Sequence, residues 1–169
     1  MATVYKHFMF RILQILPLIL LFLICIKDDS LFHFKFFDLL SFNFQYIIIY
    51  YWVLKNPQIL GYGFIFLAGI VNDVVVGLPI GVSSITYLLL SGFAAYIRYL
   101  TVQPSLIYDW IIFVPSIAVT NSVYFYILRI FFDIEIDYIA LALNTGITIL
   151  LYPVIGILFS FLANIIIKE

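Results

Sequence analysis

Six apolar runs follow one another along the chain, and only short polar breaks separate them. They cover approximately residues 8–26, 38–54, 59–77, 80–99, 105–130 and 138–167. A helix needs about 20 predominantly apolar residues to cross the hydrocarbon core of a bilayer. The sequence therefore predicts an all-α integral membrane protein, a single domain over residues 1–169 that forms a bundle of six transmembrane helices.

The composition agrees with a chain surrounded by lipid. Hydrophobic residues make up 66% of the sequence and charged residues only 10%, whereas charged residues are about 25% of an average soluble chain. The six runs leave no material for a domain outside the membrane. The formal net charge of −1 offers no basic field that would attract nucleic acid.

The second run is the shortest and allows two interpretations. Its 17 residues reach about 26 Å as a helix, slightly less than the core of a bilayer. Asn43 and Gln45 lie inside it. A re-entrant or shallow element is therefore an alternative, which reduces the count to five spans. Before it, phenylalanines alternate with polar residues from Phe32 to Phe37, a pattern typical of an aromatic belt at the membrane interface.

The basic residues predict the orientation of the chain, because lysine and arginine concentrate on the cytoplasmic side. In the six-span arrangement one side receives five of them and the other side three. The five are Lys6, Arg11, Lys55, Arg98 and Lys168, and the three are Lys27, Lys35 and Arg129. We therefore expect both termini in the cytoplasm.

Asp73 lies inside the third run, where a charged side chain costs about 2.5–3.5 kcal/mol on insertion scales. Gly69, Asp73, Gly77 and Gly81 recur at every fourth residue, so the first three are expected to stack on one helix face. Glycine on either side of the acid would let a neighbouring backbone approach closely. Residues 77–81, with Pro79 at their centre, predict a tight turn that pairs the third and fourth runs as a hairpin.

Several side chains are candidate partners for the Asp73 carboxylate. Counting back from the turn places Ser84 opposite Asp73, and Asn121 and Arg129 are further candidates in the fifth run. Three roles remain open for Asp73: helix packing, recognition of a partner, or binding of a substrate or proton.

No motif indicates catalysis. The chain has no phosphate-binding glycine loop, no nucleophile elbow and no paired-histidine zinc motif. The two histidines, His7 and His33, are predicted at opposite membrane faces and cannot share a metal. The single Cys25 excludes an intramolecular disulfide. We expect a protein that is not an enzyme and that has neither a cofactor nor a metal.

One stretch of the sequence resembles a known family. Tyr51-Trp52, then Pro57, then Gly69-x-x-x-Asp73-x-x-x-Gly77-x-Pro79-x-Gly81 is similar to the rod shape-determining protein MreD. Val74-Val75-Val76 departs from the family, where a small polar residue commonly precedes the glycine. The resemblance implies a non-enzymatic multipass protein of the bacterial inner membrane that serves cell elongation.

The resemblance also implies partners. Family members bind MreC directly and, through it, associate with the MreB filament, RodA and a class B penicillin-binding transpeptidase, which synthesise peptidoglycan. In architecture the family resembles the six-helix substrate-binding subunit of energy-coupling-factor transporters. The alternative is therefore a transporter subunit that binds a small molecule or lipid intermediate in an outward-opening cavity at Asp73. Small residues in the fourth run leave contact with another protein or a second copy open.

Overall fold

The computed structural model describes residues 15–26, 43–101, 105–134 and 137–167, with side chains up to residue 163. The described residues form an all-α structure with six helices. These are the helix Ile15–Ile26, α3 (Phe44–Lys55), α4 (Tyr62–Val76), α5 (Val82–Leu100), α6 (Leu106–Phe132) and α7 (Tyr138–Ile167). Each helix overlaps one of the ranges that the apolar runs predict and extends at most two residues beyond it. The predictions for His7, for His33 and for the aromatic stretch Phe32 to Phe37 lie outside the described residues.

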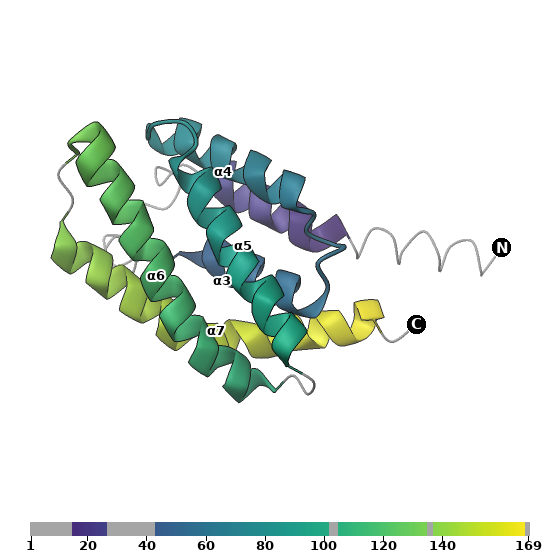
Figure 1. Cartoon of the computed structure of the whole chain (residues 1–169). Coiled ribbons are helices and arrows are strands. Elements are labelled where there is room, and N and C mark those ends of the chain that lie inside the picture. The colour runs from purple at the N-terminus through teal and green to yellow at the C-terminus, as the bar shows by residue number, and fades with distance from the viewer. Residues whose placement is uncertain (1–14, 27–42, 102–104, 135–136, 168–169) are drawn as a thin grey trace, which may run out of the picture.

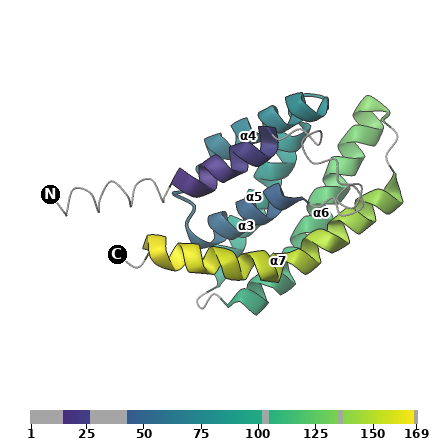
Figure 2. The same ribbon diagram turned by 180° about the vertical axis from the view of Figure 1, so that it is seen from behind.

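Helix α3 lies at the centre of the molecule, with the other helices around it (Figures 1 and 2). Nine consecutive residues, Tyr46 to Leu54, are buried, and none of them is more than 6% exposed. A helix that is apolar all round must be covered on every face. Here α5 and α7 pack directly against α3, and Leu21 and Cys25 of the helix Ile15–Ile26 belong to the same core.

The length of α3 bears on the second predicted span. The helix has 12 residues, about 18 Å at 1.5 Å per residue, whereas a bilayer core is about 30 Å thick. Its first turn lies beside the middle of α7, because the Asn43 backbone N–H donates to Thr148 Oγ1 at 3.0 Å. By length alone this helix does not reach across a bilayer core, and both interpretations of the second run stay predictions.

Two helices are long and apolar enough to cross a membrane by length and composition. They are Leu106–Phe132 and the portion Tyr138–Ala163 of α7. The helices Ile15–Ile26 and Tyr62–Val76 are apolar but shorter over the described residues. Three of the four lie inside ranges predicted as spans, and Leu106–Phe132 extends two residues beyond its predicted range.

A proline inside α7 explains a hydrogen bond between α6 and α7. Pro153 has no N–H, so the carbonyl of Ile149, four residues earlier, lacks its usual helical donor. Trp110 of α6 fills this position, because its indole Nε1–H donates to Ile149 O at 2.8 Å. The kink-prone turn of one helix is therefore closed by a side chain of its neighbour.

Candidate functional site: the hairpin of helices α4 and α5

The acid predicted inside the third run is fully buried at the junction of α4 and α5. Asp73 is 0% exposed. Its Oδ2 accepts from the backbone N–H of Gly81 at 2.7 Å, and the backbone N–H of Ser83 donates to Oδ1 at 2.9 Å and to Oδ2 at 3.2 Å. The carboxylate of one helix therefore caps the amino end of the next.

The amino end of α5 needs this carboxylate. The first N–H groups of a helix have no partner within it, and the helix dipole adds positive potential at the same place. No side chain at the N-cap position, Gly81, can accept these hydrogen bonds. Asp73 supplies the missing acceptor from the preceding helix, and the amides supply the solvation that a buried carboxylate requires.

Gly69 sets the distance between the two helices. A β-carbon at this position would lie 2.4 Å from Ser84 Cα and 2.5 Å from Ser84 N, closer than any real contact. The Ser84 hydroxyl adds a hydrogen bond to the carbonyl of Phe66 at 2.9 Å, and Asn72 Nδ2 donates to Ser83 Oγ at 3.0 Å. The close approach expected beside the acid is present, and the backbone that approaches belongs to this chain.

Gly77 and Gly81 lie at the two ends of the turn that residues 77–81 predict. Both have positive φ angles, +76° and +106°, and a β-carbon on either would meet nothing within 4 Å. Gly77 ends α4 in the left-handed conformation, with the Leu78 N–H bonded to the Asp73 carbonyl at 2.8 Å. The Gly77 N–H bonds to the Asp73 carbonyl one helical turn earlier, and the stacking of Gly77 on the helix face of Gly69 and Asp73 stays a prediction. These two glycines shape the turn around Pro79, whose carbonyl accepts from Val82 N at 3.3 Å.

The side chains predicted as partners of Asp73 bond elsewhere. Ser84 lies opposite Gly69, one helical turn from the expected position, and donates to Phe66. Asn121 Nδ2 donates to Thr145 Oγ1 at 2.6 Å. Arg129 Nη1 lies 3.7 Å from Asp133 Oδ1 on the exposed end of α6. The predictions of Ser84, Asn121 and Arg129 as partners of Asp73 were wrong, because both carboxylate oxygens accept from backbone amides of the turn and of the first turn of α5.

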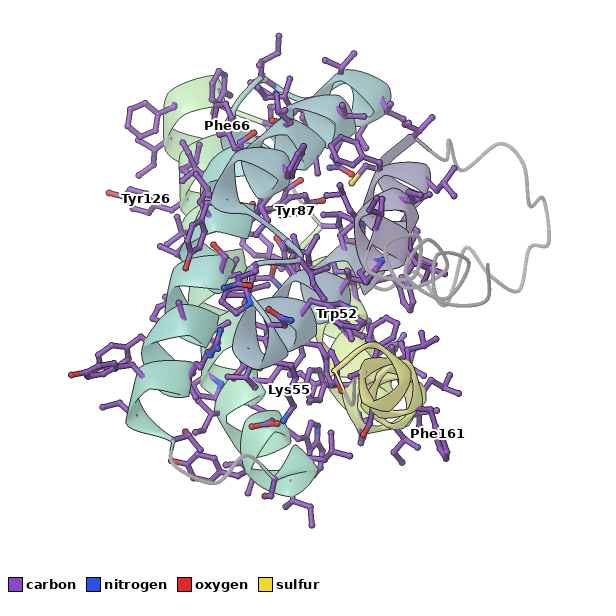
Figure 3. All side chains as sticks on the ribbon, turned by 90° about the vertical axis from the view of Figure 1, so that its right-hand side faces the viewer. Trp52, Lys55, Phe66, Tyr87, Tyr126 and Phe161 are labelled. Carbon is purple, nitrogen blue, oxygen red and sulfur yellow. The ribbon has the colours of Figure 1, made fainter. Side chains whose placement is uncertain are left out.

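A second buried acid was not identified from the sequence. Asp109, in the first turn of α6, is 0% exposed, and its Oδ2 lies 2.8 Å from Lys55 Nζ at the end of α3. Figure 3 shows Lys55 directed into the molecule below Trp52. The available signal was an acid near the start of a run that is predicted to begin on the same side as Lys55.

The Asp73 carboxylate joins the end of α4 to the start of α5. Both of its oxygens accept from backbone amides. In the described part of the chain, no group of three or more histidine, cysteine or acidic side chains could hold a metal ion. A groove of about 400 Å³ lies on α6, lined by Ala118, Val119, Ser122, Val123 and Tyr126, and it does not include Asp73.

Comparison of the chain with protein-family models, with curated proteins and with solved structures finds no match. The functional conclusion therefore depends on the residues and their geometry.

Proposed function

We propose that this chain is a non-enzymatic multipass protein of the bacterial inner membrane that binds MreC and helps to organise peptidoglycan synthesis during cell elongation. The observation that carries the proposal is the Asp73 hairpin. The residues similar to MreD between Gly69 and Gly81 form one structural unit, in which each has a distinct physical task. A sequence similarity whose residues also work together in space is better support than similarity in hydropathy.

The outer surface supports a membrane location. Large apolar side chains on the outside of α6 and α7 are more than half exposed, among them Ile107, Phe131, Leu150 and Phe161. In Figure 3, Tyr126 and Phe161 point away from the molecule. A soluble monomer rarely exposes so many apolar side chains together. Lipid tails can cover an apolar surface without the unfavourable free energy of exposing it to water. The two longest helices are long enough to cross a membrane.

The geometry of Asp73 favours the structural role over the transporter alternative. A ligand-binding acid must present an oxygen to a cavity, whereas Asp73 is 0% exposed and both of its oxygens accept from α5. Because the Gly69 face is occupied by α5, we expect MreC to bind at an outward face of the bundle.

The proposal is tested by site-specific photo-crosslinking in bacteria that express this protein together with MreC from the same genome. The crosslinking amino acid is placed at Phe66 of α4, Tyr126 of α6 or Phe161 of α7, which are all exposed. The buried Leu90 of α5 is the control position. We expect a crosslink to MreC from at least one exposed position and none from Leu90. If no exposed position crosslinks to MreC and the two proteins do not co-purify, the proposed function is wrong.

A further inference from the structure

Buried polar atoms without partners are uncommon in folded proteins, where more than about 90% of such groups are hydrogen-bonded. The described part of this chain contains several. Those without a hydrogen-bond partner are Trp52 Nε1, Thr101 Oγ1, Asp109 Oδ1, Asn121 Oδ1 and Tyr152 OH. Two of them, on Asp109 and Tyr152, belong to one cluster of side chains between α3, α6 and α7.

The Asp109 carboxylate is only half used. Oδ2 is paired with Lys55 Nζ at 2.8 Å, while Oδ1 is buried and has no donor. The Tyr50 hydroxyl lies close by and donates to the Asp109 backbone carbonyl at 3.5 Å. A buried acceptor without a hydrogen bond destabilises the folded state, so a ligand that donates to Oδ1 would stabilise it.

Tyr152 of α7 approaches the same place. Its ring stacks on Phe113 with centroids 4.5 Å apart, and Phe113 follows Asp109 by one helical turn on α6. The Tyr50 ring meets Tyr152 edge-on at 5.8 Å. Asp109 Oδ1 and the Tyr152 hydroxyl, which both lack a hydrogen-bond partner, therefore lie in one region that is lined by aromatic rings.

The chemistry of these groups selects the ligand. Oδ1 can only accept, so a ligand must donate a hydrogen bond to it. Lys55 already neutralises the carboxylate, so a neutral donor avoids the repulsion that a second cation would meet. The Tyr152 hydroxyl can donate or accept. We propose that Asp109 Oδ1 and the Tyr152 hydroxyl are the protein's half of a small buried site for a hydroxyl-bearing neutral ligand, either water or the hydroxyl of an amphiphile.

The first test is thermal unfolding of the purified full chain in detergent. The ligand gives the Tyr152 hydroxyl a hydrogen bond, so we expect Tyr152→Phe to lower Tm by about 2–4 °C. Tyr126→Phe makes the same chemical change at a position that is 60% exposed, and its Tm should equal that of the native protein. If the site is empty, Tyr152→Phe removes an unsatisfied hydroxyl, and an unchanged or higher Tm overturns the proposal.

The second test is an experimental structure of the native chain at a resolution that shows ordered water. We expect density within about 3.2 Å of Asp109 Oδ1 and of the Tyr152 hydroxyl. A compact peak identifies water, and density that continues beyond it identifies an amphiphile. Both results support the site, and the absence of density at both atoms overturns it whatever the unfolding measurement gives.

Discussion

At the scale of the residue, one acid explains the local geometry of the hairpin. Asp73 is a side-chain acceptor, and it also provides the carbonyl that closes the end of α4. The same residue thus ends one helix and begins the next. Its burial is tolerated because two backbone amides and the positive end of α5 replace the water that it would otherwise require.

We expect the two acceptor oxygens of Asp73, and not only the size of its side chain, to contribute to the free energy of unfolding. Asp73→Asn keeps the size but places an NH₂ group where one backbone N–H now donates, which leaves donors facing each other. We expect a loss of about 1–3 kcal/mol of unfolding free energy, measured by thermal or chemical unfolding in detergent. Asp133→Asn is the matched control, because Asp133 is exposed and its contact with Arg129 is long. Equal stability of the two variants would contradict the capping role.

The absence of a side chain at Gly69 is expected to be essential. A methyl group there would lie 2.4 Å from the Ser84 backbone, so Gly69→Ala must separate α4 from α5. We expect it to cost about 1–3 kcal/mol, the range for overpacking. Gly92→Ala on α5 meets nothing within 4 Å and should be neutral or stabilising by up to about 1 kcal/mol. Unfolding of both variants side by side measures the difference, and equal effects would mean that the close approach is not required.

The position of Asp73 at a close helix contact is predictable from the sequence, but the groups that donate hydrogen bonds to it are not. An acid with glycines four residues to either side marks a close helix contact. Its donors are backbone amides, which every residue except proline has, so no residue type in the sequence distinguishes them. Asp109 has an ordinary explanation in the sequence, since acids are favoured in the first turn of a helix. Its partner Lys55 lies 54 positions earlier, and only the fold brings the two together.

At the scale of the element, the ranges of the helices are predictable from the apolar runs and the glycine and proline breaks. The hairpin of α4 and α5 follows from the turn at residues 77–81. The environment of α3 is not predictable in this way. A short apolar helix can be an incomplete membrane span or the centre of a bundle with the same sequence, and the decision depends on helices that come later in the chain.

The contact between Trp110 and the interrupted turn of α7 predicts a coupling between two residues. Trp110→Phe removes the donor to the Ile149 carbonyl, and we expect a loss of about 1–3 kcal/mol beyond the change in packing. In a Pro153→Ala background the residue at position 153 regains its N–H and can supply that carbonyl itself. The cost of Trp110→Phe should therefore be smaller there. A double-mutant cycle of unfolding free energies measures the coupling, and simple additivity would contradict it.

At the scale of the whole molecule, the polarity of the surface and the placement of charge suggest an orientation. The outer faces of α6 and α7 expose large apolar side chains, which favours contact with lipid. The Lys55–Asp109 pair places the end of α3 and the start of α6 on the same side of the molecule. In the proposed membrane orientation this side faces the cytoplasm, and the turn between α4 and α5 faces outward.

This orientation is tested by labelling single cysteines with a reagent that does not cross membranes. Gln58 and Ile80 are exposed, and they precede and follow α4. In a variant with Cys25 replaced by serine, Ile80→Cys should react in cells whose outer barrier is opened, and Gln58→Cys only after the inner membrane is permeabilised. The reverse pattern would invert the orientation, and labelling of both before the inner membrane is permeabilised would show that α4 does not cross the membrane.

The enclosure of α3 also has a consequence for how the protein is made. Translation delivers α3 well before α5 and α7, which cover it. For that interval the nascent chain holds a largely apolar helix that only the helix Ile15–Ile26 can cover. We therefore expect the ribosome-bound intermediate to rely on an insertase or chaperone, and a polypeptide that stops before α7 to be removed by proteolysis.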